Sequence, residues 1–234
     1  HGIKNINKMD GVPYLTQDPV QPGETFSYEF PVNQSGTYWY HAHFESWKQV
    51  AKGLYGPLVV NDKTDDLIED DIVILADDWR LNKNYQIDEK SFGSLMDWSH
   101  AGRVGNWLTI NGKKSPQYSI KENSIARLRF INASNARILK FGSSLKNNNI
   151  IAIDGVAVNP MLVADFTLAP GQRIDLLINT VDLLKVDFFE ISHTKQLKAF
   201  TLNVTKADNK TKNITNIKFK SNLILPEIDN AKPI

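Results

Sequence analysis

The sequence predicts an all-β fold arranged as two Greek-key β-sandwiches. Many short segments are rich in β-branched and aromatic residues, and several alternate apolar and polar residues with a period of two. Turn dipeptides such as Asn111-Gly112 and Asp154-Gly155 separate these segments. No stretch of about 12 residues or more has helical periodicity. The 234 residues suffice for two domains of ordinary size.

Strands are expected wherever these apolar segments lie between turn residues. The expected strands are 26–32, 37–44, 54–61, 71–79, 124–132, 173–179, 186–192 and 199–205. Between the second and third of them, residues 46–52 are expected to form a short turn of helix. This spacing of short strands is typical of sandwiches.

An acidic, polar stretch, NDKTDDLIEDD at 61–71, is the best candidate for a domain boundary. Residues 1–65 are then expected to be the C-terminal part of a first domain that lacks its N-terminal strands, since His1 opens the chain without an initiator Met or a signal peptide. Residues 71–205 form the second domain. The Lys- and Asn-rich residues 206–234 are expected to be a linker or tail toward a missing third domain.

Composition excludes several functions. The chain has 27 basic and 26 acidic residues, so its net charge of +1 gives no reason to expect nucleic acid or a membrane surface as a partner. No apolar run approaches the roughly 20 residues that span a bilayer. The sequence contains no cysteine, which excludes disulfides, iron–sulfur clusters, zinc–thiolate sites and thiol nucleophiles.

Two histidines are spaced for metal binding. His41 and His43 lie two residues apart in TYWYHAHF, so a strand there would project both rings from one face, roughly 6–7 Å apart. Neutral imidazole is a good copper ligand. Taken alone, however, this spacing more often belongs to two half-buried histidines that have hydrogen-bond partners and bind no metal.

The surrounding segments resemble the multicopper oxidase family, which includes laccases, bacterial cuprous oxidases and copper-resistance oxidases. The opening residues HGIKNINKMDGVPYLTQDPVQPGETFSYEF resemble the family's segment that begins in its HxHG motif. SGTYWYHAHFESWKQVAKGLYGPLVV resembles the family's second copper motif, GTYWYHSH followed by GLYGPLIV. LRFINASNAR and IAIDGVAVNPMLVADFTLAPGQRIDLLI are similar to bacterial members. The resemblance covers about 1–205 and implies cupredoxin-like sandwiches.

The resemblance implies a copper role for individual residues. His1 matches the second histidine of HxHG and would bind one copper of the binuclear (type 3) pair. His41 would share that copper, and His43 would bind its partner. Asp10, in MDGV, matches an acidic position near the cluster, where a carboxylate could orient water and pass protons. The alternative for Asp10 is a turn residue before Gly11, and the two alternatives are evenly balanced.

The family's complete centre differs from this sequence. It uses more histidines, from two domains, and a type 1 copper held by a cysteine, whereas at most three ligands occur here and no cysteine does. The expected partners are therefore a missing C-terminal cupredoxin domain or its equivalent, O2 and a small reducing substrate. The second domain is expected to bind no metal, and the chain by itself to be inactive.

Two functional interpretations remain. The first is a fragment of an oxidase that couples one-electron oxidation of phenolic, amine or cuprous substrates to reduction of O2 to water, in the periplasm or secreted. The alternative is a non-enzymatic copper-binding protein or a copper-free cupredoxin scaffold. Retention of His1, His41, His43 and Asp10 argues against complete loss of the ligands.

Other polar and aromatic residues carry weaker signals. Trp39 and Tyr40 are expected in the core rather than in an electron path. His100 is expected to make a loop hydrogen bond, and His193 to face solvent after a strand. The dipeptide Asp77-Asp78 is expected to cap a strand through turn hydrogen bonds rather than to bind a metal.

Overall fold

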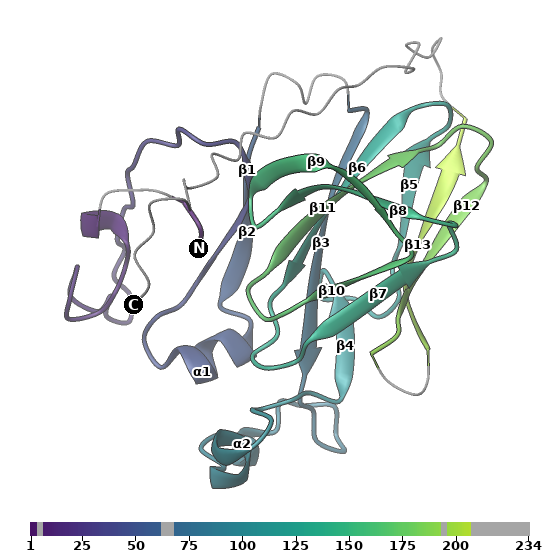
Figure 1. Cartoon of the computed structure of the whole chain (residues 1–234). Helices are drawn as coiled ribbons and strands as arrows, with labels where there is room; N and C mark the ends of the chain where they lie inside the picture. Colours follow the sequence, from purple (N-terminus) through teal and green to yellow (C-terminus); the bar gives the residue numbers. More distant parts are fainter. Residues whose placement is uncertain (4–6, 62–67, 193–195, 207–234) are drawn as a thin grey trace, which may run out of the picture.

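The computed structural model describes residues 1–3, 7–61, 68–192 and 196–206. Within them the predicted all-β fold is confirmed. A six-stranded and a five-stranded sheet pack face to face as a β-sandwich, and a separate two-stranded sheet lies beside it (Figure 1). No helix of the described part is long and apolar enough to cross a membrane.

The six-stranded sheet is mostly antiparallel. Only β3 and β6 run parallel within it, and β6 and β11 form its centre. In spatial order its strands are β4 (Trp107–Ile110), β3 (Asp70–Trp79), β6 (Ile125–Asn132), β11 (Arg173–Asn179), β8 (Asn148–Ile153) and β9 (Val156–Val163).

The five-stranded sheet completes the sandwich, with one parallel pair between β13 and β5. In spatial order its strands are β10 (Asp165–Leu168), β7 (Leu139–Ser143), β12 (Lys185–Glu190), β13 (Leu197–Thr205) and β5 (Gln117–Lys121). Crossovers between the two sheets, such as β3 beside β6, give the non-sequential order that is typical of Greek-key sandwiches.

Phenylalanine dominates the sandwich core. Phe130 on β6 is fully buried, and its ring contacts rings from β7, β10, β12 and β13, which join the two sheets. Phe188 and Phe200 stack with centroids 4.6 Å apart. Every residue of β6 is buried, because one face of this strand points into the core and the other is covered by the two-stranded sheet. The sequence of β6, IARLRFIN, is not a continuous apolar run, because Arg127 and Arg129 alternate with apolar residues. This period of two is the signal from which β6 could be predicted.

The two-stranded sheet, β1 (Gly36–His41) and β2 (Tyr55–Val60), is called here the ribbon. The predicted helical turn between its strands is confirmed as α1 (Ser46–Gln49) and the 3-10 turn η2 (Val50–Lys52). At the start of the ribbon, a Cβ atom on Gly36 would clash with the carbonyl of Gly155. The ribbon backbone therefore lies directly against a turn of the sandwich.

The described residues contain three further helical pieces outside the sheets. The 3-10 turn η1 (Asn7–Met9) precedes the ribbon. Between β3 and β4, the chain makes a lobe at the bottom of Figure 1 that contains the 3-10 turn η4 (Glu89–Ser91) and α2 (Leu95–Ser99). The hydroxyl of Ser94 accepts a hydrogen bond from the Asp97 backbone and caps α2.

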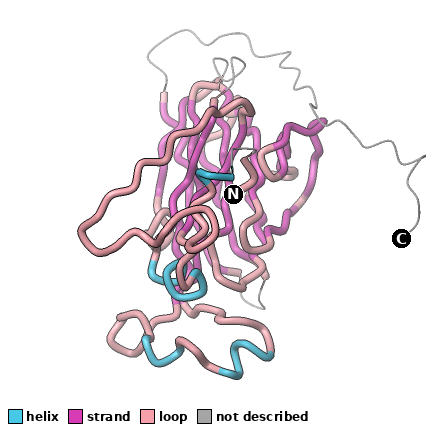
Figure 2. Tube along the Cα trace, turned by 90° about the vertical axis from the view of Figure 1, so that its left-hand side faces the viewer, coloured by secondary structure: helices cyan, strands magenta, loops and turns pink. Residues whose placement is uncertain are grey.

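One strand prediction in the first region is wrong. Residues 26–32 are loop, with Phe26 39% and Tyr28 49% exposed, because no strand within the described residues pairs with them. The side view in Figure 2 shows the chain before β1 running mostly as loop. The described residues before 62 contain one two-stranded sheet, and their assignment as the C-terminal part of a first cupredoxin domain stays a prediction. The predicted tail beyond 206 lies outside the described residues.

Candidate metal centre

Three imidazoles gather where the N-terminal residues meet the end of β1. The ring centroids of His1 and His41 are 6.0 Å apart, and those of His41 and His43 are 4.9 Å apart with nearly parallel planes. The indole of Trp39 lies 4.5 Å from the His41 ring and 5.8 Å from the His1 ring. The structure thus brings together all three predicted ligands.

Backbone contacts hold two of these histidines. The backbone nitrogen of His1 donates to the carbonyl of Trp39 at 2.6 Å, which fastens the N-terminal segment to β1. His41 is the last residue of β1 and pairs with Tyr55 across the ribbon. The strand ends there, so the expected placement of His41 and His43 on one strand face, roughly 6–7 Å apart, is wrong. Regular strand structure ends at His41, and the two ring centroids are 4.9 Å apart.

The His41 ring is oriented by its neighbour. Nδ1 lies 3.1 Å from the carbonyl oxygen of Ala42, and a carbonyl can only accept, so Nδ1 carries the hydrogen. Nε2 of the neutral ring then keeps a free lone pair. Burial lowers the pKa of His41, against the opposing effect of this hydrogen bond, and the neighbouring His43 lowers it further. A neutral imidazole with a free Nε2 is the form that binds metal ions.

The buried side of the cluster is lined by Trp39 and a turn of the sandwich. Trp39 is 5% exposed, and its Nε1 has no hydrogen-bond partner among the described residues. A Cβ atom on Gly171 would lie 3.5 Å from Cζ2 of Trp39 and 3.7 Å from Nε2 of His1. Gly171 has a φ of 80°, a value that favours glycine, so the turn can lie flat beneath these rings.

Asp10 lies near the cluster on the surface. Its backbone nitrogen donates to the carbonyl of Asn7 in the turn after η1, and its side chain is exposed. Burial and the guanidinium of Arg173 lower the pKa of the His1 amine, and the carboxylate of Asp10 opposes them. Asp10 therefore interacts electrostatically with the His1 end of the cluster, and its role in proton transfer stays a prediction.

The donor set suits copper but does not enclose one ion. With metal–nitrogen distances of about 2.0 Å, two imidazoles on one ion have ring centroids no more than roughly 6 Å apart, and both ring pairs lie within this limit. Among the described residues, no group of three or more His, Cys, Asp or Glu side chains is arranged to hold a metal ion. Two pairs of imidazoles, His1 with His41 and His41 with His43, are therefore close enough to share an ion.

Predictions for the other singled-out residues have mixed outcomes. His100 makes the expected loop hydrogen bond, with Nδ1 3.2 Å from the Met96 carbonyl. Trp39 is buried as expected, whereas the core prediction for Tyr40 is wrong, since it is 60% exposed. His193 lies outside the described residues.

The strand-cap prediction for Asp77 and Asp78 is wrong, because both lie buried inside β3. Asp77 accepts a hydrogen bond from the Tyr55 hydroxyl at 2.5 Å, and Asp78 forms an ion pair with Arg137 at 2.7 Å. Burial raises the pKa of Asp77 to about 7. The two carboxylates therefore connect β3 to other parts of the chain, Asp77 to Tyr55 on β2 and Asp78 to Arg137.

Sequence reasoning missed the polar contacts that hold the ribbon to the sandwich. Thr37 on β1 donates to Asp175 at 2.7 Å and accepts from Arg129 at 3.0 Å, all three of them buried. Arg173 reaches the carbonyl of Thr37 from β11. One signal in the sequence could have indicated these contacts. Charged residues occur inside apolar strand segments, as in ARLRF and QRIDLL, and a charge that is buried in a strand normally has a partner.

Comparison with known proteins identifies the family. Two family models described as multicopper oxidase match residues 1–65 and 70–219. Laccase-1 of Cryptococcus neoformans var. neoformans serotype D is 29% identical over 215 residues, which cover 81% of this chain and 34% of that protein. A copper resistance protein A homolog of Pseudomonas syringae pv. tomato is 28% identical, over 78% of this chain and 38% of that protein.

Solved structures resemble the fold over nearly its whole length. A multicopper oxidase from Pseudomonas thermotolerans superposes with a TM-score of 0.86 at 26% identity, covering 99% of this chain and 56% of that one. Lac15, from a marine microbial metagenome, has a TM-score of 0.77 at 30% identity, covering 97% of this chain and 57% of that one. The chain spans about a third of the length of the curated relatives and about half of the solved ones.

Proposed function

The chain belongs to the multicopper oxidase family, and from this premise we propose that His1, His41 and His43 are ligands of the type 3 copper pair of an oxygen-reducing centre. Members of this family are oxidoreductases that use copper. The observation that carries the proposal is the gathering of these rings, with centroid distances of 6.0 and 4.9 Å, at the end of one strand.

Bound copper would supply the one-electron chemistry that reduces O2, and the protein would hold and orient the ligands. His41 is preset for this role, because its Nδ1 donates to the Ala42 carbonyl and leaves Nε2 as the ligand atom. In this proposal His1 and His41 share one copper and His43 binds the other. Asp10 would orient water beside the pair and pass protons to it.

The remaining ligands are proposed to come from further protein. The sequence has no cysteine for a type 1 copper, and the relatives extend well beyond the matched region. A cupredoxin domain beyond the second domain would supply the electron entry site and choose among phenolic, amine or cuprous substrates. Without it, the chain is proposed to bind copper but not to turn over. The relatives include a copper-resistance protein, and we place the protein in the periplasm or outside the cell.

Copper titration of the full chain tests the ligand set. A short N-terminal extension keeps a free amine away from His1, so that amine and ring do not chelate Cu²⁺ together. We expect Cu²⁺ binding that weakens by about tenfold or more in His41→Ala and in His43→Ala, because each loses an imidazole ligand. Isothermal titration against a competing chelator measures the affinity.

His100→Ala is the matched control, since His100 is an exposed histidine bound to its own loop rather than to the cluster. Its copper affinity should equal that of the unaltered chain. Copper binding that ignores both His41→Ala and His43→Ala would overturn the proposal and favour the copper-free scaffold.

A further inference from the structure

Arg173 is a buried arginine whose guanidinium is bound almost entirely by main-chain oxygens. Its side chain is 4% exposed. Nε donates to the Thr37 carbonyl at 3.2 Å, Nη1 to the Gly171 carbonyl at 2.9 Å, and Nη2 to the Asp154 carbonyl at 3.0 Å. Asp154 also supplies a carboxylate oxygen 3.1 Å from Nη1. Three chain segments therefore converge on one charged group.

Each of two bonded segments leads directly to the histidine cluster. Thr37 belongs to β1, two residues before Trp39, whose carbonyl holds the backbone of His1. Gly171 belongs to the turn beneath Nε2 of His1 and the indole of Trp39. The third segment, at Asp154, is part of the sandwich and fixes the guanidinium to it.

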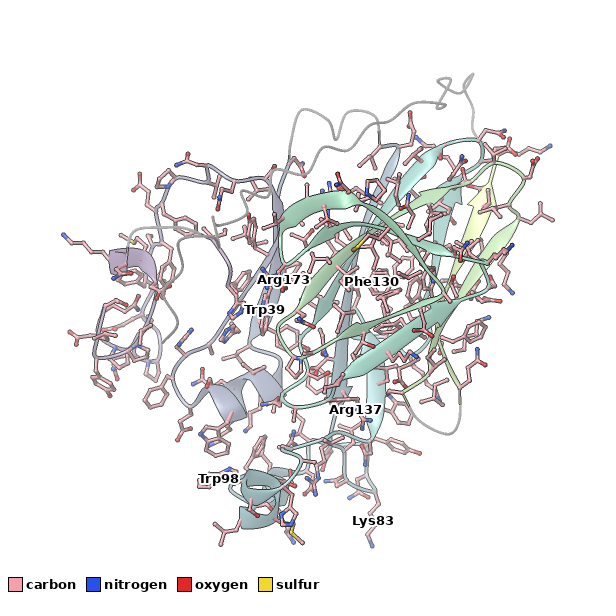
Figure 3. The ribbon with its side chains drawn as sticks, viewed as in Figure 1. Trp39, Lys83, Trp98, Phe130, Arg137 and Arg173 are labelled. Carbon is pink, nitrogen blue, oxygen red and sulfur yellow. The ribbon has the colours of Figure 1, made fainter. Side chains whose placement is uncertain are left out.

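The N-terminal segment also contacts the guanidinium itself. Gly2 has a φ of 86°, and a Cβ atom on it would clash with Nη2 of Arg173. The backbone that follows His1 thus lies flat on the arginine head. Figure 3 shows Arg173 and Trp39 side by side, on the flank of the sandwich where the ribbon packs.

We propose that Arg173 is a positioning residue that sets the separation of His1 and His41 by fixing Gly2, Thr37 and Gly171 against the sandwich. The inference rests on the proposed function, and adds that the second domain, which supplies no ligand, determines how the first presents its ligands. Arginine suits the task because its planar fork donates in three directions at once, whereas lysine offers a single nitrogen.

The test compares the full chain with Arg173→Gln, Arg173→Lys and a matched control, Arg137→Lys. Arg137 also links a carboxylate and a carbonyl, Asp78 and Gly105, and Figure 3 shows it at the lower edge of the sandwich, below Arg173 and Trp39. The first readout needs no metal. Nuclear Overhauser contacts and chemical shifts of the His1 and His41 ring protons report their separation, while core methyl resonances confirm the fold.

We expect Arg173→Gln to abolish the contact between the two rings and to lower Cu²⁺ affinity by about 10–100-fold, the range for residues that support metal ligands. Arg173→Lys should fall between Gln and the unaltered chain, and Arg137→Lys should change neither readout. Ring contacts and shifts that persist in Arg173→Gln, or an equal change in Arg137→Lys, would overturn the inference. If the unaltered chain does not bind copper through His41 and His43, the proposed function is refuted. The role of Arg173 is tested separately, because the contacts between the rings are measured without metal.

Discussion

The sandwich and the ribbon are held by different forces. In the sandwich, the fully buried Phe130 packs against four other aromatic rings, and both sheets contribute to one apolar core. In the ribbon, Tyr38 and Trp39 are buried, and Trp39 packs against a few aliphatic neighbours on and beside β3 and β6. Its other anchors are polar, through Thr37 to Asp175 and Tyr55 to Asp77.

The difference suggests a role for the sandwich in supporting the proposed metal centre. Apolar burial is roughly proportional to area and has no direction, so it stabilises the sandwich without itself selecting the orientation of a particular polar group. Buried polar contacts add little net stability because desolvation offsets them, yet they need defined geometry. The region that carries the histidines is therefore attached by contacts that fix position rather than by contacts that supply most of the stability.

The largest expected effect lies in the sandwich. Phe130→Ala removes a fully buried ring that joins the two sheets and should lower the free energy of unfolding by about 3–5 kcal/mol. Because the ribbon depends on the sandwich, urea denaturation should unfold both at the lower midpoint. A ribbon that keeps its hydrogen-exchange protection while the sandwich unfolds would show that the two regions are independent.

Removing a polar anchor should separate the two regions. Thr37→Val keeps the shape of the side chain but deprives Asp175 and Arg129 of a buried hydroxyl, at a cost of about 1–3 kcal/mol. Even in the unaltered chain, amides of the ribbon should exchange faster than those of β6 and β11. In the variant, hydrogen exchange should accelerate across β1 and β2 and stay unchanged in the sandwich core.

Equal protection of ribbon and sandwich in the unaltered chain would contradict this comparison. Ser119→Ala on β5 is a suitable control, since Ser119 is an exposed hydroxyl residue far along the chain from the ribbon. Surface substitutions of this kind usually change stability by less than about 0.5 kcal/mol.

Much of the fold could be predicted because its central strands are segments rich in aliphatic and aromatic residues. Segments 124–132 and 173–179 became β6 and β11 with boundaries shifted by at most one residue. Six strands, β4, β5, β7, β8, β9 and β10, were missed. Most of them are short, and β9 contains Pro160, which an edge strand tolerates. The alternation of apolar and polar residues at 26–32 is compatible with a strand, but a strand also needs a neighbouring strand with which to pair, and 26–32 are loop.

The candidate site divides in the same way. Its three histidines could be found because their motifs are local in the sequence. The residues that position them could not, since Arg173 lies 136 residues from Thr37 and Asp175 lies 138 from it. Only the packing of β1 on β11 brings these groups together.

The link between Tyr55 and Asp77 should make the ribbon's attachment depend on pH. The pKa of Asp77 is raised from 3.8 to about 7, chiefly by burial, so the folded chain keeps a proton that the unfolded chain has lost between these values. The free energy of unfolding should therefore fall as pH rises from about 4 to about 7. Asp77→Asn should flatten this dependence, measured by urea denaturation at pH 5 and pH 7.5.

Tyr55→Phe tests how the Tyr55 hydrogen bond affects the pKa of Asp77. The Tyr55 hydrogen bond lowers the pKa of Asp77 against the larger effect of burial. Its loss should raise that pKa further and move the pH-dependent window upward, with a net cost of about 1 kcal/mol for the missing bond. An unchanged pH profile in both variants would show that Asp77 does not govern the attachment.

The smallest effect is expected in the lobe that contains α2. Trp98 is 67% exposed, and its only described ring partner is Trp47 of α1, 6.4 Å away. Trp98→Ser should change the free energy of unfolding by less than about 0.5 kcal/mol. Since the ribbon is anchored through β1 and Tyr55, hydrogen exchange at α1 and β2 should also stay unchanged. Faster exchange there would mean that the lobe helps to hold the ribbon. The ribbon would then be attached by an aromatic contact as well as by its polar contacts with the sandwich.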